Sequence, residues 1–460
     1  MVEAVTMHKA EKYAIIRQEC PDDMIVFFMR NFGCRRKVYN LYTDFYYQQL
    51  ENAGYTSGDD IPEVKLPEVT KFKEQYPYLK EADSLALANA KIGFEQAVER
   101  FREQGNHTKY TKRAIRRDKS GTEPLSFRGL KGMPKFKARA RGNFSYTTNC
   151  QYPEESNNLT RPTIRLEGNM LHLPKLKTDI PLRIHRPLPA NAVIGNVTVS
   201  MDCDGTLYAS IIYSYTVMMD LTIRKAASGG NDEYLKGLNI LGLDYSQQDF
   251  YVDSEGRTAN YPHYYRKAEE KLAKLQRELS GMEKGSNNYE KQLKKIQRLH
   301  KKIRNQRKDF INKEAAYLSS TYDAVAVEDI NLRAMGEGLS LGKNLHDNGF
   351  GMFREQLANK LEAKGSVLIK VDRLYPSTKT CSHCGSVNPD VALGVKEWDC
   401  PVCGTRLLRD YNAAVNIREE GRRIFADYFA NWLEEDAASR KCAEIRSEGR
   451  KRKKKKQTAA

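Results

Sequence analysis

The chain has 460 residues, of which 40% are hydrophobic and 29% charged, and its formal net charge is +17. This length suffices for two to four domains with ordinary hydrophobic cores. The N-terminus lacks the apolar core of a signal peptide, and no apolar run approaches ~18 residues, so the sequence predicts neither secretion nor a membrane span and favours the cytoplasm. The positive surplus favours a polyanionic partner such as nucleic acid, although a merely soluble basic protein is the alternative.

The N-terminal part of the chain is predicted to be mainly helical. A short strand is expected over residues 13–19. A long helix should follow from Asp22, because apolar and aromatic side chains recur there at helical spacing. Residues 54–80 are polar and rich in turn formers, which predicts a loop. Ser84 is expected to cap a second helix. Helices with mixed basic and aromatic faces suit a nucleic-acid lobe, whereas core packing is the alternative role for the aromatic residues.

Two groups of basic residues are candidate nucleic-acid ligands. Arg35 and Arg36 interrupt the apolar pattern of the first helix. Residues 134–142, PKFKARARG, alternate basic and other side chains, so on a strand the basic ones would form one ridge along a phosphate backbone. The ridge would consist of Lys135, Lys137, Arg139 and Arg141. The alternative is a solvated edge strand that its charges protect from pairing. Residues 160–216 then predict several short strands, which indicates a small β-domain such as a barrel.

Strands and helices alternate in the second half of the chain. The apolar segments LNILGLD, AVAVEDI and SVLIKVD are predicted to be buried strands, and NAAVNIRE a helix. Residues 264–318 predict two long antiparallel helices with a break near residues 285–288. Residues 266–308 hold fifteen Lys or Arg against five Glu, which favours a helical wall facing nucleic acid over a coiled-coil scaffold. The basic tail, RKRKKKKQTAA, is expected to be unstructured.

Three acids occupy similar local settings. Asp244 and Glu328 end predicted strands, and Asp410 starts the last predicted helix. One such acid would be a helix cap or a salt bridge, but three in an α/β pattern favour a metal site. Carboxylates suit Mg²⁺ or Mn²⁺, and two such ions can activate water and hold the leaving oxygen of a phosphodiester. The competing neighbours are Asp253, Asp323 and Asp329.

A C-x2-C-x15-C-x2-C pattern predicts a second metal site. Its members are Cys381, Cys384, Cys400 and Cys403. Each pair is followed by a glycine that lets the backbone turn under the thiolates. Four thiolates close the coordination of Zn²⁺, so this site is predicted to be structural, and an iron–sulfur cluster is the alternative. The other five of the nine cysteines are scattered, which suits a reducing compartment better than a disulfide framework. His383 could replace a cysteine ligand, but we interpret it as a bystander.

Four of these segments, LNILGLDYS, AVAVEDINL, RLYPSTKTCSHCG and LLRDYNAAVNI, resemble the motifs of the TnpB family of transposon-encoded, RNA-guided nucleases and of their descendants, the compact type V CRISPR effectors. LGKNLHDNGFGMFREQL, the basic helical region and GMPKFKARARGNFSY also resemble family segments. Leu407 and Leu408 depart from the charged residue usual before the final Arg-Asp. The resemblance implies a multidomain fold: an RNase H-like (RuvC) nuclease with an inserted zinc-ribbon, a helical recognition lobe and a β-barrel wedge domain.

The resemblance also implies boundaries for these parts. They are 1–21 for the first wedge strand, 22–115 for the recognition lobe, 116–220 for the wedge barrel, 221–376 for the nuclease with its basic insertion at 264–318, 377–406 for the zinc-ribbon, 407–430 for the end of the nuclease and 431–460 for the basic tail. The ribbon would then lie beside the third acid only because it is inserted there.

The implied activity is Mg²⁺-dependent, RNA-guided cleavage of double-stranded DNA. The resemblance places the catalytic, metal-binding acids at Asp244, Glu328 and Asp410, with two Mg²⁺ ions. A guide RNA would pair with one DNA strand beside a short motif that the protein reads, and one centre would cut both strands. The protein would work in the prokaryotic cytoplasm, at the nucleoid when bound. Two alternatives remain open: a catalytically silent RNA-guided repressor, and a DNA-bridging zinc-ribbon protein that needs no RNA.

Overall fold

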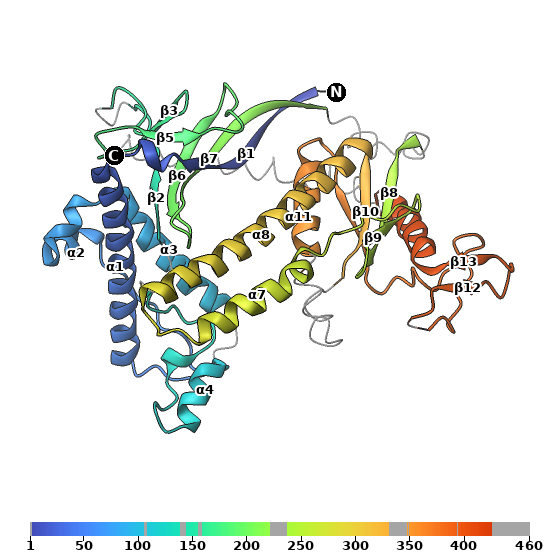
Figure 1. Ribbon diagram of the computed structural model, residues 1–460, viewed down its shortest axis with the longest axis horizontal. Helices are drawn as coiled ribbons and strands as arrows, with labels where there is room; N and C mark the ends of the chain where they lie inside the picture. Colours follow the sequence, from blue (N-terminus) through green and yellow to red (C-terminus); the bar gives the residue numbers. More distant parts are fainter. Residues whose placement is uncertain are drawn as a thin grey trace, which may run out of the picture. The chain divides into compact units, whose positions relative to one another are not determined.

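The computed structural model describes residues 2–104, 108–138, 144–154, 159–220, 237–330, 347, 349–392 and 394–425. The chain divides into two units, one formed by residues 6–216 and the other by residues 1–5 and 217–460 (Figure 1). Residues 224–236, whose lack of periodicity predicts a linker, and the predicted basic tail lie outside the described residues. None of the described helices combines the length and apolarity needed to cross a membrane.

The first unit contains a seven-stranded sheet with the order β2-β6-β7-β1-β5-β4-β3. Its strands are β1 (Val2–Ile15), β2 (Ser145–Asn149), β3 (Arg165–Glu167), β4 (Met170–His172), β5 (Ile180–Arg183), β6 (Val193–Met201) and β7 (Leu207–Asp220). Alternation explains β6, where Val197 and Val199 are buried between more exposed neighbours. The prediction of several short strands over residues 160–216 is confirmed, whereas closure into a barrel stays a prediction.

Helix α1 (Asp22–Asn52) links two hydrophobic cores of this unit. Its first half, with Phe28 and Phe32, packs with the sheet residues. Its second half, with Tyr42 and Tyr46, packs with the next long helix, α3 (Ser84–Glu103). Apolar side chains at helical spacing therefore predict this helix correctly, because both of its ends bury an apolar face.

Several local predictions for this unit need correction. The strand predicted over residues 13–19 ends at Ile15 and gives way to a 3-10 turn, η1 (Arg17–Glu19). The predicted loop at 54–80 contains a short helix, α2 (Val69–Gln75). The cap of α3 is Asp83, whose carboxylate accepts the Leu85 amide at 2.9 Å, so a carboxylate and not the predicted Ser84 hydroxyl satisfies the free amide of the first turn. The other short elements are η2 (Pro77–Glu81), α4 (Lys112–Lys119) and η3 (Phe127–Gly129).

The second unit is built on a four-stranded sheet with the order β11-β10-β8-β9. Its strands are β8 (Ile240–Ser246), β9 (Phe250–Asp253), β10 (Ala324–Glu328) and β11 (Leu368–Val371). β10 pairs in parallel with both β8 and β11, and β9 runs antiparallel to β8. The three apolar segments therefore form buried strands as predicted, since parallel strands with both faces covered read as continuous apolar runs.

Helices cover both faces of this sheet. The odd-numbered residues of β8 and β10, such as Leu243 and Val325, pack against α8 (Asn287–Thr321) and α11 (Phe350–Glu362). The even-numbered residues of these two strands, such as Ala326, pack with Ile369 and Val371 of β11 against Ile417 of a helix over residues 409–425. α7 (Tyr264–Ser280) lies antiparallel to α8, with the break between them at residues 281–286, close to the predicted position (Figure 1). A two-stranded sheet, β12 (Glu397–Asp399) with β13 (Arg406–Leu408), lies in the cysteine-containing segment.

Candidate functional site

The register of β8 and β10 brings two of the three predicted acids together. Leu243 of β8 pairs with Val327 of β10 in a parallel ladder, so the next residues, Asp244 and Glu328, lie side by side on neighbouring strands. Both have even numbers, and side chains alternate along a strand, so both share the sheet face that packs against the 409–425 helix. Glu328 ends its strand as predicted, whereas β8 continues beyond Asp244 to Ser246.

Small residues bring the third acid to the same face. At Gly242, an added Cβ would collide with the Ala414 carbonyl oxygen and would lie 2.6 Å from the Arg418 nitrogen. The absence of a side chain at this position therefore lets the helix backbone rest directly on β8. At Gly421, an added Cβ would collide with Ala326 of β10 in the same way. Asp410 lies in the first turn of this helix.

The three carboxyl groups form one electrostatic cluster. Asp244 is 8% exposed, and its pKa is raised well above the usual range, first by burial and then by the negative charges of Asp410 and Glu328. Burial also raises the pKa of Glu328. The Arg409 guanidinium opposes the rise at Asp244, and it donates to Asp410 Oδ1 from Nε at 3.0 Å and from Nη2 at 2.8 Å.

This arrangement has the chemistry of a site for a hard cation. Desolvated carboxylates that repel one another are costly unless positive charge meets them. Arg409 supplies one positive charge to the three acids, and carboxylate oxygens are the ligands that Mg²⁺ prefers. The sequence analysis does not predict Arg409 as a site residue, although Arg409 directly precedes Asp410 in the chain.

The three competing acids have other partners. Asp329 lies within 3.4 Å of the Arg354 guanidinium, and Asp323 accepts the Asn239 amide at 2.9 Å. Asp253 is fully buried, accepts backbone amides at residues 255 and 257, and lies within 3.4 Å of the Arg257 guanidinium. These contacts give each of them a structural role.

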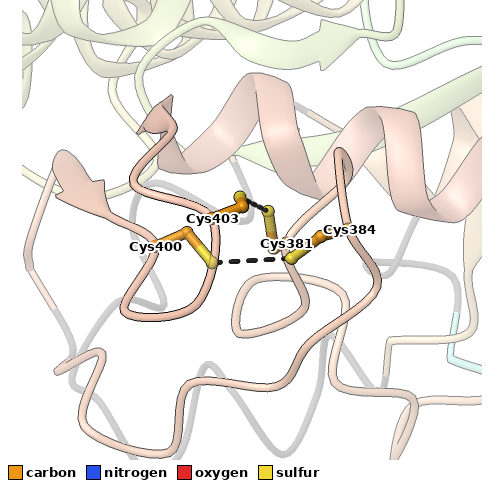
Figure 2. A group of neighbouring side chains, drawn as sticks. All are labelled: Cys381, Cys384, Cys400 and Cys403. Carbon is orange, nitrogen blue, oxygen red and sulfur yellow. Dashed lines mark hydrogen bonds between the residues drawn. The ribbon is translucent and has the colours of Figure 1, made fainter.

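The four cysteines of the C-x2-C pairs form a second cluster. They come from two loops and face one another (Figure 2). Cys381 Sγ lies 3.7 Å from Cys403 Sγ, and Cys384 Sγ lies 3.6 Å from Cys400 Sγ. All four sulfur atoms lie within 4.8 Å of one another. Among the described residues, these cysteines form a group of side chains that could hold a metal ion. The three acids do not gather as tightly. Four converging thiols fit one tetrahedral metal ion.

Two equivalent turns create this cluster. In the first, the Gly385 amide donates to the Cys381 carbonyl at 2.8 Å, and in the second the Gly404 amide donates to the Cys400 carbonyl at 2.9 Å. Both glycines have positive φ, 75° and 71°, a conformation that favours glycine. The residue after each glycine carries a hydroxyl: Ser386 Oγ lies 3.2 Å from Cys400 Sγ, and Thr405 Oγ1 lies 3.2 Å from Cys403 Sγ.

Hydrogen bonding and burial shift the pKa values of two of these thiols in opposite directions. The Ser386 hydroxyl, followed by the backbone amides of Val402 and Cys403, lowers the pKa of Cys400 to about 6. Burial raises the pKa of Cys381 to about 11. His383 is exposed, in keeping with its interpretation as a bystander.

The residues predicted to bind nucleic acid have different surroundings in the structure. Arg35 Nη1 donates to the Ser145 carbonyl at 3.3 Å and to its hydroxyl at 3.2 Å, and burial lowers the pKa of Arg35. Arg36 is half-buried. Residues 134–138 form no strand, because Lys137 is fixed by side-chain contacts: its amide donates to Asn40 Oδ1 at 2.8 Å, and its ammonium lies 3.4 Å from the Tyr39 ring centroid.

The predicted basic ridge is therefore wrong for the described residues, because Lys135 and Lys137 do not alternate along a strand. Lys135 is exposed and lines an open pocket of about 330 Å³ together with Arg113 and Arg117. Arg139 and Arg141 lie outside the described residues. Binding of nucleic acid by these residues stays a prediction.

Comparison with known proteins locates sequence similarity in the second unit. A family model described as "Probable transposase" matches residues 227–337, which include β8, α7, α8 and β10. A model described as "Cas12f1-like, TNB domain" matches residues 350–417, which include α11, the four cysteines and Asp410. The three acids therefore fall within the two matched regions.

Two bacterial relatives extend the similarity along the chain. The protein is 27% identical over 404 residues to one from Streptomyces pristinaespiralis, with 87% of each chain covered. It is 28% identical over 316 residues to InsQ of Escherichia coli strain K12, covering 65% of this chain and 71% of that one. Both relatives are named "Putative RNA-guided DNA endonuclease".

A solved structure of a Cas12f1–sgRNA–target DNA complex covers 90% of this chain and 99% of the matched chain, at 13% identity and a TM-score of 0.47. The family models and the named relatives confirm the resemblance to TnpB-type proteins and compact type V effectors that the sequence motifs indicated.

Proposed function

We propose that this protein is an RNA-guided DNA endonuclease. The observation that carries the proposal is the cluster of Asp244, Glu328 and Asp410. Two buried or half-buried acids lie side by side on parallel strands, and the third lies on the helix that packs against the same face of the sheet. The names of the two bacterial relatives support the same activity. The sheet with helices on both faces supports an RNase H-like (RuvC) fold for this unit.

In this proposal, the three acids hold two Mg²⁺ ions. When bound, the two ions supply an activated water and stabilise the leaving oxygen of a phosphodiester. β8 and β10 fix Asp244 and Glu328 side by side, and the 409–425 helix presents Asp410 to them. Arg409 orients Asp410, since both of its bonds converge on one carboxylate oxygen. Because burial and the neighbouring negative charges raise the pKa of Asp244, a bound cation would offset the cost of keeping these acids ionised.

The four cysteines are proposed to hold one structural Zn²⁺ ion. Their sulfur atoms leave no open position for water, so the zinc would stabilise the ribbon and take no part in cleavage. The chain contributes its basic surface to binding a guide RNA and target DNA. The net charge of +17 and the lysine- and arginine-rich α7 and α8 support this part of the proposal. The domain boundaries and the wedge and recognition roles of the first unit are proposed from the resemblance.

The test compares acids on opposite faces of the same sheet. Asp244→Ala and Glu328→Gln should each lower Mg²⁺-dependent cleavage of a supercoiled plasmid by roughly a thousandfold, while RNA-dependent DNA binding is retained. Asp329→Asn is the matched control, because Asp329 follows Glu328 directly but pairs with Arg354. It should cleave within a few-fold of the wild-type rate.

Cleavage at the wild-type rate by the Asp244→Ala variant would overturn the assignment of the metal site. RNA-dependent binding without cleavage by the wild-type chain would support the silent repressor instead. Sequencing the RNA that copurifies with the protein would identify whether a CRISPR repeat or a transposon end supplies the guide, and absence of bound RNA would favour the DNA-bridging protein.

A further inference from the structure

Two asparagines on the helix that carries Asp410 are buried. Asn412 is 0% exposed and Asn416 is 5% exposed. Residues four apart lie on the same face of a helix, one above the other. Burying a side-chain amide is unfavourable unless it forms hydrogen bonds. The hydrogen-bond partners of these asparagines therefore show which segment this face of the helix binds.

Both asparagines bind the backbone of the first cysteine turn. Asn412 Oδ1 accepts the Ser382 amide at 2.8 Å, and Asn412 Nδ2 donates to the Thr380 carbonyl at 2.8 Å. These two backbone groups flank Cys381. Asn416 Nδ2 donates to the Ser377 carbonyl at 2.8 Å and to the Thr380 carbonyl at 2.7 Å. The side chain of Asn412 thus brackets one predicted zinc ligand from both sides, as a paired strand would.

The second cysteine turn reaches the same helix by a covalent route. β13 follows Cys403 and ends at Leu408, and the helix begins at the next residue. The Arg409 amide also donates to the Lys396 carbonyl at 2.8 Å, which fixes the start of the helix to the ribbon. The first turn is therefore joined to the helix by the asparagines, the second by the chain, and the two turns to each other by the cysteine cluster.

The opposite side of the helix rests on the sheet. Ala414 contacts β8 at Gly242, and Ile417 is buried among strand residues. Asp410 lies at the end of the helix nearest the ribbon, one turn before Ala414. The contacts at Ala414 and Ile417 lie farther along the helix than Asp410, whereas the bonds of Asn412 and of the Arg409 amide hold its first turn to the ribbon.

We propose that Asn412 and Asn416 are positioning residues that couple the metal-bound first cysteine turn to Asp410. They fix the first two turns of the helix to this cysteine turn, and so set the position of the Asp410 carboxylate relative to Asp244 and Glu328. The ribbon thus supports the position of the third acid, Asp410, and is not only an insertion beside it. The catalytic consequence rests on the proposed nuclease function, whereas the mechanical coupling does not.

The first test needs no substitution and no activity. Removing zinc from the wild-type protein with a chelator should raise hydrogen exchange at the amides of residues 413–416 at least about tenfold, because the first turn then loses its support. Unchanged exchange at these amides after complete zinc removal would overturn the coupling.

The second test removes the asparagine contacts with zinc in place. Asn412→Ala and Asn416→Ala should retain one zinc per chain yet already show the raised exchange. Asn412→Asp is a milder variant, since a carboxylate still accepts the Ser382 amide but cannot donate to Thr380. The matched control is Asn388→Ala, because Asn388 bonds within the ribbon, to the Asp390 amide, and it should behave like the wild type.

The third test separates positioning from general destabilisation. In the Asn412→Asp variant, the Mg²⁺ concentration that gives half-maximal cleavage should rise about three- to tenfold, whereas loss of folded protein alone would lower the maximal rate without moving it. An unchanged Mg²⁺ dependence together with wild-type exchange would overturn the proposal. A wild-type chain that does not cleave would refute the proposed function, and the exchange experiments would still decide the coupling.

Discussion

The cysteine cluster and the carboxylate cluster are both candidate metal sites in one unit, but they are assembled differently. The four sulfur atoms converge within 4.8 Å through two short turns. The three acids come from two strands and a helix whose residues are up to 166 positions apart, from Asp244 to Asp410. Thiols are neutral when protonated and can crowd together, whereas ionised carboxylates repel one another until a cation joins them.

This difference indicates how each site depends on the rest of the fold. The cysteine site depends on local turn geometry and on the metal itself. The acid site depends on the packing of the 409–425 helix against β8 and β10, and on Arg409. Substitutions that damage one support and spare the other therefore test the comparison.

The largest effect is expected from loss of a cysteine ligand. Cys381→Ser should abolish stoichiometric zinc binding and unfold the ribbon, because the binding energy of a structural zinc site, about 10–16 kcal/mol in small zinc domains, is also folding energy. Zinc content of the purified protein measures this outcome. Cys203→Ser, at an exposed cysteine of the other unit, is the control and should keep one zinc per chain. Full zinc occupancy in Cys381→Ser would contradict the assignment.

Crowding the helix on the sheet should damage the acid site selectively. Gly242→Ala should destabilise the sheet by about 1–3 kcal/mol, because its new Cβ meets helix backbone that cannot rotate away. Hydrogen exchange at β8 and β10 measures the change, and zinc content should stay normal. Gly93→Ala is a suitable control, since nothing lies within 4 Å of that added Cβ. A Gly242→Ala protein as stable as the wild type would argue against direct contact of helix and strand.

Removing the positive charge of Arg409 should lower the stability of the protein by a smaller amount, and added Mg²⁺ should restore it. Arg409→Gln should lower the melting temperature of metal-free protein, by an equivalent of about 1–2 kcal/mol, since Asp410 loses its two charge-assisted bonds. Added Mg²⁺ should then stabilise this variant more than it stabilises the wild type, because the ion replaces the lost charge. Equal Mg²⁺ stabilisation of both proteins would separate Arg409 from the acid cluster.

The smallest effect concerns a half-buried charge that has partners. Burial, followed by the Arg35 charge, lowers the pKa of Lys137 from 10.5 to about 8. The unfolded chain therefore binds more protons than the folded one between those two values, and wild-type stability should rise with pH across that window. Lys137→Met lacks this titration, so its stability relative to the wild type should fall by about 1 kcal/mol from pH 7 to pH 10.

Hydrogen exchange at α1 at the two pH values measures the Lys137 effect. A stability difference that does not change between pH 7 and pH 10 would mean that the ammonium is already well solvated in the folded protein. The Tyr39 ring over the ammonium offsets part of the burial cost and limits the size of the effect.

Predictions from sequence were most accurate where one physical requirement acts over a short span. The apolar runs of β8, β10 and β11 and the aromatic repeat of α1 give their elements directly, because each must bury an apolar face. They failed where a side chain has a distant partner. The alternating pattern around Lys135 and Lys137 predicts a strand, but contacts of Lys137 with Asn40 and Tyr39 hold the segment in another conformation. The cap of α3 is Asp83 and not the predicted Ser84.

The sequence by itself determined the four-cysteine cluster, since the spacing and the two glycines specify both turns within a few residues. It also identified three acids at element boundaries. Only the tertiary structure decided that Asp244 and Glu328 share a sheet face, that Gly242 admits the helix bearing Asp410, and that Asn412 and Asn416 fasten this helix to the first cysteine turn. Strand register and helix docking join residues far apart in the chain, and no local pattern encodes which of them will meet.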